Sequence, residues 1–229
     1  NIAIGKSAAA ANTTGTRNIT IGWEAYNNSD TENDNIAIGY NAMTTNTAGG
    51  TANVALGNYA LDALTSGDLN VAVGYDALST TSTGVNNVAV GSYALTANTT
   101  GASNNAVGYN ALGANTTGTE NTAMGHRAGQ TYTTTAGNTG VGFEALKLNT
   151  GNYNTAAGVR AQSASGGAGD NTAFGYEALA GNASGGQTVG IGFKALTANT
   201  TGVNSIAVGF EALMGNTTAD NNVAIGYRA

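Results

Sequence analysis

Residues able to carry out catalytic or metal chemistry are scarce in this chain of 229 residues. There is no Cys, which excludes thiolate metal sites and disulfides. His126 is the only histidine and stands in a column of aromatic residues, so we interpret it as a substitution in that column. Three acids in one loop, Asp30, Glu32 and Asp34, are the one cluster considered for a cation. We expect no catalytic residue, no cofactor and no metal site.

Charged side chains form a pattern in the second half of the sequence. Seven of them recur at nearly regular intervals and alternate in sign without exception, and we call this set the charge column: Arg127, Glu144, Arg160, Glu177, Lys194, Glu211 and Arg228. Opposite charges on neighbouring strands contribute roughly 0.2–1 kcal/mol per pair. The alternation therefore predicts a structural ladder in which each repeat contacts the next at the same column.

Aromatic residues recur at the position just before the charge column. This aromatic column contains Trp23, Tyr40, Tyr75, Tyr109, Phe143, Tyr176, Phe193, Phe210 and Tyr227, and the ring moves by one position at Tyr59 and Tyr93. One interpretation is a ladder of stacked rings that stabilises the fold. The alternative is a sugar-binding interaction face, for which the candidates are Trp23, Tyr40, Tyr75, Tyr109, Tyr176 and Tyr227.

These columns belong to a repeat that runs through the whole chain. The phrase Asn-x-Ala-Val-Gly recurs about fourteen times, with a period of about 17 residues between its glycines. The interval is one residue longer between Gly39 and Gly57 and one residue shorter between Gly142 and Gly158. The consensus unit is N-x-A-V-G-Y-E-A-L-x-x-N-T-T-G-x-x. We interpret residues 1–229 as a single repeat array without a linker.

Each position of the unit suggests a structural role. The residue before the glycine is always apolar, as in Ile4, Val73, Met124, Phe174 and Ile225, so we expect it in the core. The Ala one position earlier indicates a sterically tight site. The glycine itself indicates a corner with a backbone angle that other residues avoid. N-T-T-G is typical of a loop, and both length changes fall near it.

The repeat unit is too short for a helical repeat or for a strand with a crossover helix. It fits one coil of an all-β, parallel β-solenoid with strands about 4.8 Å apart. We expect Asn-x-Ala-Val-Gly to form a strand. For the Tyr-Glu-Ala-Leu half we favour a second strand, with a helical turn or irregular coil as alternatives. Because the apolar columns are too numerous for one thin coil to enclose, we expect copies to pack side by side.

Charge and hydropathy exclude two kinds of partner. The net charge of −6 argues against binding to nucleic acid. Apolar runs are only a few residues long, which argues against membrane insertion. The chain begins with Asn, and we expect it to be a fragment of a longer protein.

The phrases NIAIGKSA, NIAIGYNA, NVAVGYDA and NVAIGYRA resemble the head repeats of trimeric autotransporter adhesins, the YadA-like head. That resemblance implies a left-handed parallel β-roll, a trimeric head and display on a bacterial surface for attachment. The unit here is longer than in that family, because N-T-T-G is inserted. Similar longer repeats resemble those of phage tail fibres and of large secreted bacterial proteins.

Together these observations predict an extracellular, non-catalytic structural and adhesive protein on a cell surface or a virion tail fibre. Its expected partners are further copies of itself, with a trimer favoured over an end-to-end polymer, and an unidentified surface receptor or glycan. The alternatives are a carbohydrate-binding or ice-binding solenoid face, a tail-fibre shaft and a subunit of an extracellular filament. Ice binding would use the Thr pairs of the loops, such as Thr99-Thr100 and Thr200-Thr201.

Overall fold

The computed structural model describes residues 1–45, 49–164 and 166–229. Its contacts divide the chain into two units, residues 1–119 and 120–229, and each is a parallel β-solenoid. Unit 1 contains seven three-residue strands, one per coil: β1 (Ile2–Ile4), β2 (Ile19–Ile21), β3 (Ile36–Ile38), β4 (Val54–Leu56), β5 (Val71–Val73), β6 (Val88–Val90) and β7 (Asn105–Val107).

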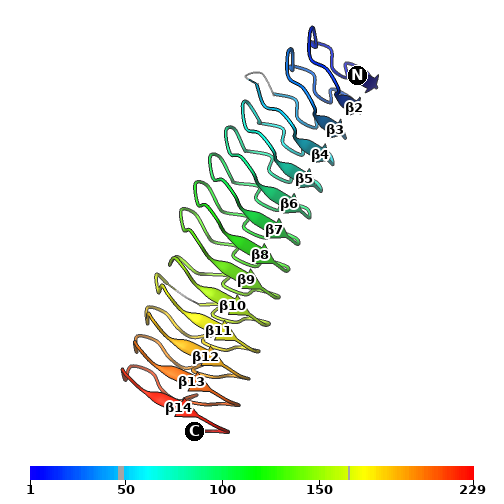
Figure 1. Cartoon of the computed structure of the whole chain (residues 1–229). Helices are drawn as coiled ribbons and strands as arrows, with labels where there is room; N and C mark the ends of the chain where they lie inside the picture. The colour runs from blue at the N-terminus through cyan, green and yellow to red at the C-terminus, as the bar shows by residue number, and fades with distance from the viewer. Residues whose placement is uncertain (46–48, 165) are drawn as a thin grey trace. The chain divides into compact units, whose positions relative to one another are not determined.

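Unit 2 repeats this organisation. Its strands are β8 (Thr122–Met124), β9 (Thr139–Val141), β10 (Thr155–Ala157), β11 (Thr172–Phe174), β12 (Val189–Ile191), β13 (Ile206–Val208) and β14 (Val223–Ile225). Within each unit, every strand pairs in parallel with the strand of the next coil (Figure 1). The predicted all-β parallel solenoid, with the period of the sequence repeat, is confirmed.

The two irregular intervals leave the strand register intact. Ile36 pairs with Val54, an offset one residue longer than usual, and Thr139 pairs with Thr155, an offset one residue shorter. The extra residue of one repeat and the missing residue of the other therefore change the length of the chain between strands, as expected from their position near the loop.

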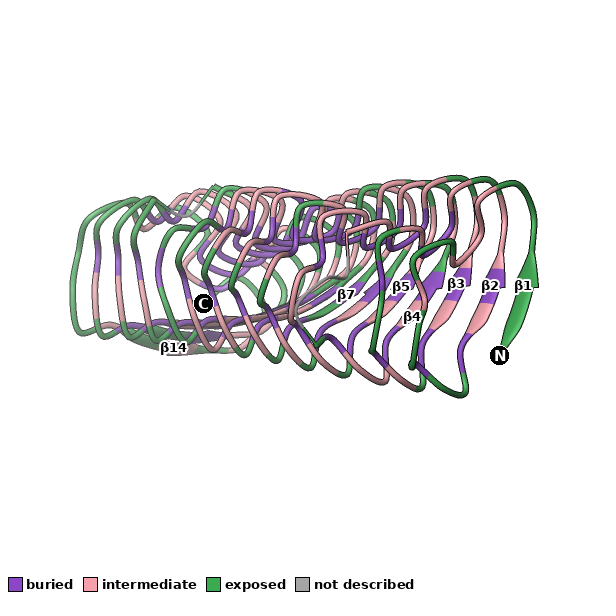
Figure 2. Cartoon of the chain, turned by 90° about the horizontal axis from the view of Figure 1, so that it is seen from above, coloured by how far each residue is buried: buried purple, intermediate pink, exposed green. Residues whose placement is uncertain are grey.

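The interior of each coil is narrow and is filled by small side chains together with leucine. In the coils between the first and the last, the middle residue of the strand and the Ala three residues after the repeat glycine are buried, and the next residue is usually a buried Leu (Figure 2). A Cβ placed on Gly140, at the middle of β9, would lie 3.5 Å from Leu146 Cδ1. The strand and the opposite wall of the coil are thus so close that Ala or Gly suits this position.

The prediction that the apolar residue before the glycine lies in the core is wrong. The side chains of Ile4, Met124, Phe174 and Ile225 are exposed, and Val73 is half-buried. Successive strand residues point to opposite faces. Since the central Ala points inward, both flanking residues point outward. The large apolar side chains of the strand therefore lie on its outer face.

The prediction of a second strand in each coil is also wrong, because the Tyr-Glu-Ala-Leu half forms turns. In the coil after β5, Asp76 and Leu78 have φ values of +59° and +53°, and the same two positions are left-handed in most coils. A pleated strand does not admit alternate left-handed residues. The N–H of Asp76 nevertheless donates to the carbonyl of Asn58 in the preceding coil, and the N–H of Leu78 to that of Ala94 in the next.

A buried column of polar side chains precedes the strands, and the sequence interpretation gave it no role. It consists of Asn18, Asn35, Asn53, Asn70, Asn87, Asn104, Asn121, Asn138, Asn154, Asn171, Thr188 and Ser205. In a typical coil, Oδ1 of Asn70 accepts from the backbone N–H of Asn87 at 3.0 Å, while its Nδ2 donates to the carbonyl of Gly84 at 2.8 Å. We call this the asparagine ladder. It ties each strand start to the loop of the next coil.

Candidate functional site

Two surface columns directly after the repeat glycine contain most of the residues singled out by the sequence. The first column is the residue directly after the glycine, where most of the aromatic side chains stand, and the second column is the residue after that. Both columns lie on the outside of the coil. The two units have different residue types in these columns.

In unit 2 the second column is the charge column. Within the described residues of this unit, five of its six neighbouring pairs are ion pairs, with distances of 3.9, 3.5, 3.9, 3.7 and 2.8 Å: Arg127–Glu144, Glu144–Arg160, Arg160–Glu177, Glu177–Lys194 and Glu211–Arg228. The exception is Lys194–Glu211. Lys194 Nζ lies 5.4 Å from the ring centroid of Phe193. The structure thus brings these seven side chains into one line along successive coils.

Glu144 is the most enclosed carboxylate of this line. Lys147 donates to its Oε1 at 2.7 Å, and the guanidinium groups of Arg127 and Arg160 lie on either side. The hydrogen bond from Lys147, followed by the nearby positive charges, holds the pKa of Glu144 below its ordinary value. Its carboxylate therefore remains ionised and paired at neutral pH.

The first column of unit 2 contains two face-to-face aromatic stacks, separated by Val159. Tyr176, Phe193, Phe210 and Tyr227 follow one another at centroid distances of 5.3, 5.0 and 5.3 Å, with planes within 14° of parallel. His126 stacks on Phe143 in the same way, at 5.3 Å. Because each ring covers the face of the next, each stack presents mainly ring edges to solvent.

Unit 1 arranges its rings differently. Five tyrosines alternate between the two columns, and we call them the tyrosine zigzag: Tyr40, Tyr59, Tyr75, Tyr93 and Tyr109. Neighbouring rings are 5.4–5.8 Å apart, and their planes are inclined by 68–80°. In an edge-to-face pair only one ring turns its face to its neighbour. Since each such pair covers at most one ring face, several ring faces of the zigzag are not covered by a neighbouring tyrosine.

Small polar residues occupy the remaining positions of the same two columns. Beside each tyrosine stands one of Asn41, Asn58, Asp76, Ser92 and Asn110. Rings and polar groups therefore alternate both along the coils and across them. The Oδ1 of Asn58 accepts from the backbone N–H of Tyr40 at 2.9 Å, which fixes part of this arrangement.

Two phenols of the zigzag, those of Tyr59 and Tyr93, are held in their neutral form. Desolvation, followed by the nearby phenols and by Asp62, raises the pKa of Tyr59. Desolvation, followed by Tyr75 and Asp76, raises the pKa of Tyr93. These hydroxyls are therefore protonated at neutral pH and can both donate and accept hydrogen bonds.

The six candidates for an interaction face do not form one surface of a single type. Tyr40, Tyr75 and Tyr109 belong to the zigzag, whereas Tyr176 and Tyr227 belong to one stack of unit 2. Trp23 lies one coil before the zigzag, and Lys6 Nζ lies 4.3 Å from its ring centroid. All six side chains are exposed.

The acidic loop cluster does not converge on a common point. Buried Glu32 accepts from the backbone N–H groups of Asp30, Thr31 and Gly49, while Asp34 pairs with Arg17. Among the residues that the structure describes, no group of three or more His, Cys, Asp or Glu side chains is placed to hold a metal ion.

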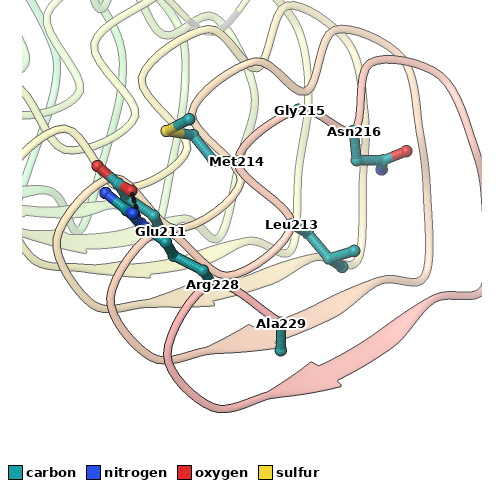
Figure 3. Close-up of a pocket in the computed structure, with 7 residues that line it drawn as sticks. All are labelled: Glu211, Leu213, Met214, Gly215, Asn216, Arg228 and Ala229. Atoms are coloured by element: carbon teal, nitrogen blue, oxygen red, sulfur yellow. Dashed lines mark hydrogen bonds and ion pairs between the residues drawn. The ribbon is translucent and has the colours of Figure 1, made fainter.

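One hollow in unit 2 lies at the last coil. It has a volume of about 700 Å³ and is lined by Glu211, Leu213, Met214, Gly215, Asn216, Arg228 and Ala229. Figure 3 shows the Glu211–Arg228 ion pair on one side of it and Leu213 and Asn216 on the other. All of its lining residues belong to the last two repeats of the sequence.

The outer face of the strands adds an apolar surface in each unit. Its larger side chains include Leu56, Val90 and Val107 in unit 1 and Met124, Val141, Phe174 and Ile191 in unit 2. Contiguous exposed apolar surface of this kind marks interaction sites in soluble proteins.

The Thr pairs of the loops are engaged between coils. The hydroxyl of Thr99 donates to the carbonyl of Thr116 at 3.0 Å, and that of Thr200 to Thr217 at 2.8 Å. A hydroxyl held in this way is less available to order water on an ice surface.

Across residues 1–45, 49–164 and 166–229, no helix has the length and apolar character that a membrane span needs. Comparisons with protein-family models, curated proteins and solved structures found no match. The repeat geometry and the surface columns are therefore the basis for a functional proposal.

Proposed function

We propose that this chain is a non-catalytic structural and adhesive repeat protein that acts outside the cell. Its copies pack side by side, most favourably as a trimer of left-handed β-rolls, on a cell surface or in a virion tail fibre. The solenoid supplies a stiff, repetitive scaffold, and the outside of its coils supplies the contacts.

The apolar outer face of the strands is the observation that carries this proposal. In unit 2, Met124 and Phe174 are 46% and 45% exposed, although their central neighbours Ala123 and Ala173 are completely buried. At about 25 cal/mol per Å² of apolar surface, a face of this kind is stabilised when another chain covers it. Packing against further copies provides that cover along the whole length of each unit.

Sedimentation equilibrium at micromolar concentration tests the assembly. The chain has a mass of 22.5 kDa, and we expect a species of three times that mass. The double variant Met124→Lys/Phe174→Lys should lower the mass, since it places charges on the apolar face. The matched variant Thr16→Lys, at an exposed loop position, should not. A wild-type chain that remains monomeric would contradict the proposed assembly.

A second candidate function, carbohydrate binding, is favoured by the tyrosine zigzag. Ice binding along the Thr pairs is less favoured, because hydroxyls such as that of Thr99 bond to the next coil. Thermal-hysteresis measurements distinguish an ice-binding face from the adhesive one, and we expect no hysteresis. A filament built from end-to-end copies would appear as a mass that increases continuously with concentration.

A further inference from the structure

We propose that the tyrosine zigzag of unit 1 binds a neutral, linear β-1,4-linked polysaccharide, with one sugar ring per coil. The proposal deepens the adhesive function proposed above, because it names a ligand class for one surface of the scaffold. It uses only unit 1, residues 1–119.

Spacing is the first argument. Consecutive coils of unit 1 pair in register, so equivalent positions lie about 4.8 Å apart. An extended β-1,4-linked chain of pyranose rings advances by about one such spacing per sugar. A straight glycan can therefore follow the coils of the solenoid ring by ring.

Alternation is the second argument. Each sugar of a β-1,4-linked chain is turned by about half a revolution relative to the one before, so its substituents alternate from side to side. The zigzag alternates with the same period, because Tyr40, Tyr75 and Tyr109 lie in the first column and Tyr59 and Tyr93 in the second. Protein surface and ligand thus both repeat after two units. An α-1,4-linked chain curls into a helix and does not share this period.

The chemistry of the surface is the third argument. Sugars bind proteins by packing their apolar C–H faces on aromatic rings and by hydrogen bonds from their hydroxyls to polar side chains. The edge-to-face geometry of the zigzag leaves ring faces that no neighbouring tyrosine covers. Amide, carboxylate or hydroxyl groups stand beside each ring, as Asn58 does beside Tyr59 and Asp76 beside Tyr75.

Charge selects the class of glycan. No Lys or Arg occurs between Arg17 and Arg127, a stretch that includes every coil of the zigzag. Asp62 and Asp76 lie close enough for the charge of Asp76 to help raise the pKa of Asp62, after desolvation as the larger cause. A surface with carboxylates and no cation repels uronate and sulfate groups, so the ligand is a neutral chain.

Unit 2 provides an internal comparison. Its rings stack face to face at 5.0–5.3 Å and stand beside the charge column rather than beside amides. Ring faces covered by other rings cannot pack on sugars. Phe193 and Phe210 are therefore matched aromatic controls outside the proposed site.

Calorimetric titration of the full chain with defined hexasaccharides tests the ligand class. The probes are the β-1,4-linked hexamer of glucose, the β-1,4-linked hexamer of N-acetylglucosamine and the α-1,4-linked hexamer of glucose. We expect at least one β-1,4-linked hexamer to bind at least about tenfold more tightly than the α-1,4-linked one. Binding of neither β-1,4-linked hexamer, or equal binding of the α-1,4-linked one, would overturn the proposal.

A rearranged variant tests the alternation itself. The substitutions Asn58→Tyr, Tyr59→Asn, Ser92→Tyr and Tyr93→Ser bring all five rings into the first column and leave the composition unchanged. We expect an affinity loss of about tenfold, while Phe193→Ala/Phe210→Ala keeps the wild-type affinity. An unchanged affinity in the rearranged variant, or an equal loss in the phenylalanine variant, would refute the assignment.

A smaller variant covers the case in which the rearranged chain does not fold. Tyr75→Ala removes the central ring, with folding checked by circular dichroism, and we expect a several-fold loss of affinity. An unchanged affinity contradicts the proposal. Sedimentation of the same samples distinguishes the failure of one proposal from the failure of the other. A protein of trimeric mass that does not bind glycan would contradict only the glycan site. A monomer that binds glycan would contradict only the proposed assembly.

Discussion

The repeat glycine Gly74 has a φ of +137°, and a Cβ built on it would lie 2.6 Å from the carbonyl carbon of Gly91 in the next coil. Both the backbone angle and the close approach exclude a side chain. We expect Gly74→Ala to destabilise the fold by about 3 kcal/mol or more, measured as a lower denaturation midpoint in urea. Gly215→Ala is the control, since nothing lies within 4 Å of its added Cβ, and it should change stability by less than about 1 kcal/mol.

Left-handed residues other than glycine are a second feature at this scale. Leu69 has a φ of +58° and is largely exposed. Its left-handed backbone is sterically unfavourable, and packing in the core does not offset this strain. Leu69→Gly should raise stability by up to about 1 kcal/mol. The exposed Leu148, whose φ is not left-handed, supplies the control: Leu148→Gly should lower stability by about 0.5–1 kcal/mol. A loss of stability in both variants would show that φ at residue 69 carries no strain.

At the scale of elements, the asparagine ladder joins each strand to the coils on either side. The side chain of Asn87 accepts from the backbone N–H of Asn104 at 3.0 Å and donates to the carbonyl of Gly101 at 2.8 Å. Asn87 is completely buried. Asn87→Ala leaves both groups without their partner, and we expect a loss of about 2–4 kcal/mol in thermal or chemical unfolding. Asn222→Ala, in the same column of the last coil, where the side chain is not buried, should cost clearly less.

The charge column links strands on the outer surface, and its contribution depends on pH. The pKa of Glu144 is lowered in the folded chain, chiefly by the hydrogen bond from Lys147. Its stabilisation is therefore present above the unfolded-state pKa and lost as pH falls through the folded-state pKa. Glu144→Gln should cost about 1 kcal/mol at pH 7 and progressively less in acid.

Glu24→Gln is the control, because its neighbours in the same column are Ser7 and Asn41, which bear no charge. Melting temperatures of both variants and of the wild type, recorded from neutral to acidic pH, provide the comparison. A difference between Glu144→Gln and wild type that stays constant with pH would contradict this account.

The sequence predicted some of these elements and not others, for physical reasons. The strand register followed from the repeat, because the repeat units align with one another. Among the strand pairings described within the two units, only Ile36–Val54 and Thr139–Thr155 depart from the common offset. Which strand residues point into the core could not be predicted from the repeat. In a triplet such as Ile36-Ala37-Ile38 size suggests that the isoleucines are buried, yet the narrow coil accepts only the Ala.

The turns and the candidate sites were predictable to different degrees. Leu rarely adopts a left-handed backbone, so Leu78 gave no indication of the turn, and this half of the repeat was taken for a strand. Every residue of the charge column could be named from the sequence. The difference between the tyrosine zigzag and the aromatic stacks of unit 2 could not, because it depends on the orientation of the rings. The sign that could have indicated it was the shift of the ring at Tyr59 and Tyr93.

At the scale of the whole molecule, the two units differ in charge. Residues 1–119 carry two basic and seven acidic side chains, whereas residues 120–229 carry five basic and six acidic ones, most of them paired in the charge column. Salt screens repulsion in the first unit and attraction in the second. About 1 M salt should therefore slow amide exchange in the strands of unit 1 and accelerate it in unit 2.

Hydrogen-exchange mass spectrometry on the intact chain follows both units in one sample. Peptides from β5 (Val71–Val73) and β12 (Val189–Ile191) make a suitable pair, since both are interior strands of their units. A salt response of the same sign in the two strands would show that the charge column does not govern the stability of unit 2.

The backbone bonds between coils also determine how the chain can fold. The N–H of Leu95 reaches the carbonyl of Ala111 and that of Tyr93 reaches Tyr75, so each coil bonds to the coil before it and the coil after it. Each finished coil can therefore act as a template for the next, without waiting for a distant part of the sequence. Within a unit, a chain that emerges end first from a ribosome or an export channel can add its coils in the order in which they appear.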